Sequence, residues 1–127
     1  MGGKFDERSP DTAITIWHNP RCTTSKKTLE LLEGRGASPV VRNYLTDPPS
    51  EAEISGVLDK LDADPRALLR KKEKLYAELD LGREDLSRDE LIRAMADNPR
   101  LIERPVVIRG DRAALGRPPE SVAVLFE

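Results

Sequence analysis

Four short β-prone segments, two in the first third of the chain and two near its end, place the strongest restriction on how this sequence can fold. They are residues 13–17, 39–45, 105–108 and 112–115. A helical pattern begins at Cys22 and ends near Gly34, which predicts a crossover helix joining the first two segments as parallel strands. The turn residues Gly110 and Asp111 separate the last two segments and predict an antiparallel hairpin.

Helical patterns fill the stretch between the second and third segments. Capping-box pairs, in which each side chain hydrogen-bonds the other residue's backbone N–H at a helix start, open two of these helices. The pairs are Ser50 with Glu53 and Ser87 with Glu90. Pro65 is expected to begin a third helix, which carries leucines as far as Leu81. A further short helix is expected at residues 121–126, after Pro118 and Pro119.

The resulting order is strand, helix, strand, helical block, strand, strand, helix. It predicts an α/β fold: a thioredoxin-like mixed four-stranded sheet flanked by helices, with the helical block inserted between strands 2 and 3. The chain has 127 residues, enough for one real core but too few for two. We expect a disordered N-terminal extension at residues 1–12, which are polar and hold two glycines and a proline, and one domain at residues 13–127.

Charge and cysteine content argue against several classes of protein. The 21 basic and 23 acidic residues nearly balance, so we expect no nucleic acid and no membrane surface as a partner. No apolar run approaches the ~18 residues of a membrane span, and the start of the chain lacks the apolar stretch of a secretion signal. One cysteine cannot form an internal disulfide. A cytoplasmic location is therefore expected.

The single cysteine, Cys22, lies where the first strand gives way to the first helix. The N–H groups of a helix's first turn lack internal partners and the helix dipole is positive there, so both favour an anion. Such a position can lower the pKa of a thiol from ~8.5 to ~3.5–7.5, which makes it a nucleophile at neutral pH. The alternative is a buried, inert cysteine.

The neighbours of Cys22 favour the reactive alternative. Three hydroxyls occupy the turn that faces the sulfur, and two bases flank it. The hydroxyls belong to Thr23, Thr24 and Ser25, and the bases are Arg21 and Lys26. His18, across the loop, is expected either to hold that loop by hydrogen bonding or to tune the thiolate. Thr23 could equally serve only as a helix-start residue.

Patterns missing from the sequence narrow the chemistry of this thiol. Position 25 is Ser25, so there is no Cys-x-x-Cys dithiol and turnover would need an external thiol. Position 28 is Thr28, so the chain lacks the Cys-x5-Arg phosphate loop of low-molecular-weight tyrosine phosphatases. One cysteine and one histidine cannot furnish a structural zinc shell, and no metal is expected.

Residues 18–29, His-Asn-Pro-Arg-Cys-Thr-Thr-Ser-Lys-Lys-Thr-Leu, resemble the active-site segment of the glutaredoxin-coupled arsenate reductase (ArsC) family. Further motifs follow in the family's order, and the resemblance spans about residues 13–127. These motifs are Tyr44-Leu45 before Pro48-Pro49 and residues 66–70, 101–107 and 115–120.

The resemblance implies a set of catalytic residues. Cys22 would be the catalytic thiolate, and the oxyanion would be held by Arg70, Arg104 and Arg117. Planar guanidinium groups suit that role because they bind such oxyanions bidentately. The resemblance also implies a cis peptide bond before Pro105.

The resemblance further implies a reaction, the reduction of arsenate to arsenite. Arsenate or a similar oxyanion would be the substrate, glutathione a co-substrate and glutaredoxin a partner protein, with no bound cofactor. The Cys22 thiolate would attack arsenic, and glutathione would attack the adduct. Ser25, His18 and Thr24 would support the thiolate by hydrogen bonding and charge.

Other functions are open from the residues alone. Arg70 could be a solvated helix residue, as Arg66 also could be, and Arg117 could merely precede a helix start. A related thioredoxin-like family binds RNA polymerase as a redox regulator. A third reading is a monothiol glutathione-dependent oxidoreductase acting on protein mixed disulfides. The three arginines, and the impossibility of a switch disulfide within this chain, favour the reductase over the regulator.

Overall fold

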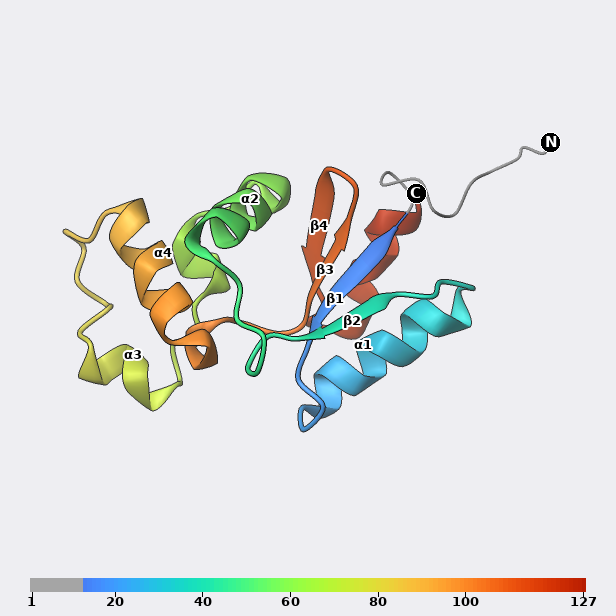
Figure 1. Cartoon of the computed structure of the whole chain (residues 1–127), viewed down its shortest axis with the longest axis horizontal. Helices are drawn as coiled ribbons and strands as arrows, with labels where there is room; N and C mark the ends of the chain where they lie inside the picture. The colour runs from blue at the N-terminus through green and yellow to red at the C-terminus, as the bar shows by residue number, and fades with distance from the viewer. Residues whose placement is uncertain (1–12) are drawn as a thin grey trace. The chain divides into compact units, whose positions relative to one another are not determined.

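The computed structural model describes residues 13–127, so the extension expected at residues 1–12 lies outside the described residues. Four strands form one sheet in the order β2-β1-β3-β4 (Figure 1). They are β1 (Ile14–His18), β2 (Val40–Asn43), β3 (Val106–Arg109) and β4 (Arg112–Leu115). β1 runs parallel to β2 and antiparallel to β3, and β3 pairs antiparallel with β4. The predicted mixed sheet is confirmed, but β1 extends through His18, which the sequence pattern places in the following loop.

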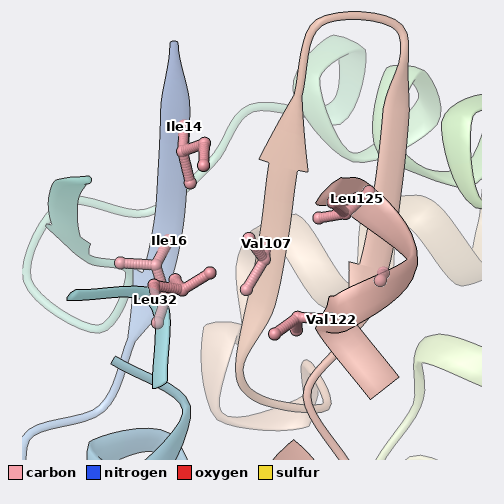
Figure 2. Packing of buried hydrophobic residues seen from close by; sticks show 7 residues of the cluster. Ile14, Ile16, Leu32, Val107, Val122 and Leu125 are labelled. Carbon is pink, nitrogen blue, oxygen red and sulfur yellow. The ribbon is translucent and has the colours of Figure 1, made fainter. Parts of the chain in front are cut away.

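Two helices pack on one face of this sheet and enclose a hydrophobic cluster (Figure 2). They are α1 (Thr23–Gly34) and the C-terminal 3₁₀ helix η3 (Pro119–Phe126). Ile14 and Ile16 lie on the same face because side chains alternate along a strand, and both join Leu32 of α1 in the cluster. Its other buried members are Val107, Ala114, Val122 and Leu125. This shared core holds α1 in place against the sheet.

The short helix expected at residues 121–126 is present and starts two residues earlier than expected. It is a 3₁₀ helix and begins at Pro119, whose fixed φ suits a first helical position. The Arg112 guanidinium donates to the carbonyls of Val124 and Leu125, each at 3.0 Å. A side chain from β4 therefore satisfies carbonyls at the helix end that a longer α-helix would have used internally.

The chain divides into two compact units. The first holds the sheet, α1 and η3, and the second, Tyr44–Glu103, is the predicted helical insertion. The second contains α2 (Glu51–Leu61), α3 (Lys74–Glu78), α4 (Arg88–Asp97) and the 3₁₀ helices η1 (Pro65–Leu68) and η2 (Pro99–Leu101). Both predicted capping boxes form, and α2 packs against α4. That residues 13–127 act as one domain stays a prediction.

The long helix expected from Pro65 is wrong, because the chain makes only the short η1 before it becomes extended. Leu69 forms an antiparallel bridge with Ile102, and the N–H of Arg70 donates to the Leu101 carbonyl at 2.8 Å. These long-range pairings hold the backbone extended where the local leucine pattern favours a helix. Arg70 therefore lies outside any helix.

Arg66, which the sequence alone allows to be a solvated residue, is half-buried within the second unit. Its guanidinium donates to the carbonyl of Leu81 at 2.7 Å and also to the carbonyl of Arg83. This side chain thus ties η1 to the segment that follows α3, and its role is structural.

Leu32 of α1 is fully buried against the sheet in the cluster of Figure 2, so we expect its truncation to destabilise the protein strongly. Leu32→Ala should lower the free energy of unfolding by about 2–5 kcal/mol, because it removes buried methyl groups and leaves a cavity. Leu79→Ala is the matched control, since Leu79 is 43% exposed and its truncation should cost less than about 0.5 kcal/mol. Urea unfolding monitored by circular dichroism measures both. Equal losses would contradict the assigned core.

Candidate active site

Cys22 occupies the N-cap of α1, one short loop beyond the end of β1. The loop is organised by Asn19, whose carbonyl accepts from the Cys22 N–H at 3.0 Å and whose Oδ1 accepts from the Arg21 N–H at 2.9 Å. The Cys22 carbonyl in turn accepts from the Lys26 N–H at 3.0 Å, which begins the helical ladder. The thiol is a free, partly exposed group at the helix start, so Cys22 is not a buried core residue.

The surroundings of Cys22 act on its pKa in opposite directions. Burial is the largest single influence and raises the pKa of the thiol. Hydrogen bonds from the backbone N–H groups of Ser25 and Thr24 lower that pKa, as expected of donors aimed at an anion. The Arg104 charge and an Arg117 hydrogen bond lower the same pKa further, and the net pKa falls below its ordinary value. The arrangement therefore favours a thiolate.

The Ser25 side chain, in the first turn of α1, is fixed by two hydrogen bonds. Its Oγ lies 2.7 Å from His18 Nδ1 and accepts from the Asn19 N–H at 3.1 Å. Both His18 and Ser25 are buried. Burial, and then the Lys26 charge, lower the pKa of His18, so the imidazole is neutral at pH 7. His18 thus joins the end of β1 to the first turn of α1, which is the loop-holding role considered from the sequence.

Two arginines from the C-terminal part of the first unit lie close to the Cys22 sulfur. Arg117 Nη1 lies 3.9 Å from Cys22 Sγ and donates to the Arg104 carbonyl at 3.1 Å. Arg104 precedes Pro105 through a cis peptide bond. The Arg117–Pro118 bond is also cis, and nothing in the sequence pattern pointed to it. Cys22, Arg104 and Arg117 therefore form one cluster on the first unit.

Arg70 belongs to the second unit, and its place in the oxyanion site stays a prediction. Its Nη1 donates to the Arg100 carbonyl at 3.2 Å and lies 3.5 Å from Glu73 Oε2. Glu73 Oε1 lies 2.8 Å from Arg100 Nη2, so one largely buried carboxylate joins two guanidinium groups. Sequence reasoning missed Glu73 and Arg100. The spacing of Glu73 three residues after Arg70 was the one available signal, and Arg100 had none.

Among residues 13–127 there is no group of three or more histidine, cysteine, aspartate or glutamate side chains placed to hold a metal ion. In the same range, no helix has the length and apolar character needed to cross a membrane. The groups that the structure places around Cys22 are backbone amide donors and the guanidinium cations of Arg104 and Arg117.

A lone activated cysteine at the start of the helix after β1, in a mixed four-stranded sheet, defines a thiol protein of the thioredoxin-like class. The ArsC family model matches residues 17–125, and this chain belongs to that family. A protein of Haemophilus influenzae called arsenate reductase is 44% identical over 111 residues, covering 87% of this chain and 96% of the relative. A Neisseria meningitidis protein of the same name is 46% identical over 114 residues, covering 89% and 97%.

A solved structure gives the same result for the fold. The arsenate reductase of Vibrio cholerae superposes with a TM-score of 0.87 at 46% sequence identity, covering 89% of this chain and 97% of its own. The expected thioredoxin-like architecture with its inserted helices is thereby confirmed.

The charge of Arg104 should matter to the ionisation of Cys22. Arg104→Gln should raise the pKa of the thiol, because a cation that favours the thiolate is lost. The pH dependence of iodoacetamide alkylation measures this cleanly, since the chain has one cysteine. Arg21→Gln is the matched control: Arg21 adjoins Cys22 and carries the same charge, yet is not among the groups that lower its pKa. Equal effects of the two substitutions would refute the assigned role of Arg104.

The single histidine should titrate below its ordinary pKa of 6.5. An NMR titration of the His18 ring protons measures this, and Lys26→Gln should move the pKa back upward. Because the folded-state pKa is depressed, the unfolded chain binds the proton more readily. The free energy of unfolding should therefore fall as pH drops below about 6.5, and His18→Gln should remove that component. A His18 pKa above 6.5 would contradict the buried neutral ring.

Proposed function

We propose that this protein is an arsenate reductase that works through the Cys22 thiolate, with glutathione and glutaredoxin as reductants. The observation that carries the proposal is the contact of Arg117 with a partly exposed sulfur whose pKa is lowered. A nucleophile and guanidinium cations at one point suit an anionic substrate. Relatives named arsenate reductase that match nearly the whole chain support the choice of arsenate.

The oxyanion would dock against Arg104 and Arg117 in front of the N-terminus of α1. Guanidinium groups offer paired donors that match two oxygens of a tetrahedral anion. Amide groups at the start of the helix add a favourable field for negative charge. Arg70 would complete the set, a role that rests on the family motif at residues 66–70.

The first chemical step would be attack of the Cys22 thiolate on arsenic. A sulfur–arsenic bond forms, and one arsenate oxygen, after protonation, leaves as water. Guanidinium groups would stabilise the charge that develops on the remaining oxygens. Arsenic remains pentavalent at this stage, so two electrons are still required.

The electrons would come from external thiols, because the chain holds one cysteine. A glutathione thiolate attacks the Cys22 sulfur of the adduct and forms a mixed disulfide. The electron pair of the broken sulfur–arsenic bond stays on arsenic, which leaves as arsenite. Glutaredoxin then attacks the glutathione sulfur and releases the Cys22 thiolate. A thiol that must be returned to its reduced form fits the reducing cytoplasm, where we place the protein.

A coupled assay with NADPH, glutathione reductase, glutathione, glutaredoxin and arsenate tests this function. Cys22→Ser should abolish arsenate-dependent NADPH oxidation. Arg104→Gln should lower kcat/KM for arsenate by about 10- to 100-fold, the cost of losing a hydrogen bond to a charged group. Arg21→Gln should stay within about twofold.

Arsenate reduction by the Cys22→Ser variant would refute the proposed function. Activity of the wild type on a glutathionylated protein, unaffected by Arg104→Gln and with no arsenate turnover, would assign the protein to the monothiol oxidoreductases instead.

A further inference from the structure

We propose that Thr28 is a positioning residue, whose hydroxyl holds the backbone that carries Arg117 to the sulfur of Cys22. Thr28 lies on α1, one helical turn beyond Thr24, and is fully buried. No step of the proposed reaction uses Thr28. Its consequence for catalysis rests on the proposed function, but its effect on the thiol does not.

The Thr28 hydroxyl bridges two segments that are far apart in the sequence. It donates to the Thr24 carbonyl at 2.8 Å, the local bond that a buried threonine in a helix commonly makes. It also donates to the Gly116 carbonyl, 88 residues away, at 3.3 Å, so its one proton is shared between two acceptors. The first contact reaches a residue whose N–H binds the Cys22 sulfur, and the second reaches the residue before Arg117. One hydroxyl thus contacts both the first turn of α1 and the residue that precedes Arg117.

Gly116 is pressed against Thr28 closely enough to exclude any side chain. A Cβ at this position would lie 2.6 Å from Thr28 Oγ1 and 2.8 Å from both Thr28 Cγ2 and Pro105 Cγ. The Gly116 N–H donates to the Pro105 carbonyl at 2.9 Å. The backbone just before Arg117 is therefore held by Thr28 through its carbonyl and by Pro105 through its N–H.

Arg117 is consequently held at both ends. Its main chain follows directly from Gly116, and its guanidinium donates to the Arg104 carbonyl at 3.1 Å. The contact of Nη1 with the sulfur is already long, at 3.9 Å, so a small displacement of residue 116 would remove it. A change at a buried threonine should therefore appear as a change in the ionisation of Cys22.

The test is the rate of Cys22 alkylation by iodoacetamide at a pH below the thiol pKa. Thr28→Val keeps the branched shape and loses the hydroxyl, and should slow alkylation about 3- to 10-fold. Thr28→Ser keeps the hydroxyl and should remain within about twofold of wild type. Thr15→Val, a matched threonine substitution on β1, should leave the rate unchanged.

A double-mutant cycle with Arg117→Ala tests whether Thr28 acts through that arginine. If it does, Thr28→Val should slow alkylation by less than about 1.5-fold once the guanidinium is gone. Effects that multiply fully would overturn the proposal, and so would a Thr28→Val protein that loses stability in urea but keeps the wild-type alkylation profile.

Gly116→Ala provides an independent route should Thr28→Val fail to fold, because its Cβ must push the same backbone away from Thr28. It should slow alkylation in the wild-type background but not in the Arg117→Ala background. Equal slowing in both backgrounds would overturn the proposal. Absence of arsenate turnover in a wild-type protein with the expected alkylation behaviour would refute the proposed function and leave the role of Thr28 intact.

Discussion

The ionisation of one sulfur is the constraint on which this molecule's chemistry depends. Burial of Cys22 opposes the thiolate, and the amide donors of the first turn of α1, together with Arg104 and Arg117, outweigh that opposition. These opposing effects on the pKa of Cys22 explain why the site combines residues from the N-terminal and the C-terminal segments of the first unit. A helix start provides aligned N–H groups, but the cations must come from the segment around β3 and β4, which the antiparallel pairing of β1 with β3 brings alongside.

The supporting contacts are buried and specific, which suits a site that must be rigid. His18 and Ser25 join the end of β1 to the start of α1, and Thr28 joins α1 to Gly116. Each of these three side chains is a buried polar group that has a hydrogen-bond partner, so none carries the cost of an unsatisfied buried polar atom. Hydrogen bonds of this kind orient the donors around the sulfur before any substrate arrives.

A single cysteine also determines what the protein would need from outside. Without a second thiol in the chain, the oxidised sulfur cannot be resolved internally, and the proposed cycle requires glutathione and glutaredoxin. Membership of the ArsC family and relatives named arsenate reductase agree with an oxyanion as substrate. In the proposed reaction, the guanidinium groups of Arg104 and Arg117 near the sulfur would bind the anion, and the sulfur would form the covalent adduct.

Local sequence was sufficient wherever the structure is set by neighbours in the chain. The four strands, both capping boxes and the start of α1 at Cys22 followed from alternation, helix-start residues and turn residues, because those interactions span only a few positions. The motif around Cys22 likewise indicated a reactive thiol. Local reasoning failed after Pro65, where the pairing of Leu69 with Ile102 overrode a helical pattern.

Tertiary structure alone decided which distant groups meet. Nothing near Gly116 or Thr28 in the sequence shows that position 116 requires a glycine. The contact between the two residues spans 88 positions and forms only in the folded protein. The same holds for the Glu73 bridge between Arg70 and Arg100. Helix starts and turns are encoded by short-range hydrogen bonding, which one stretch of sequence contains in full. Convergence of side chains depends on packing between segments, which no single stretch contains.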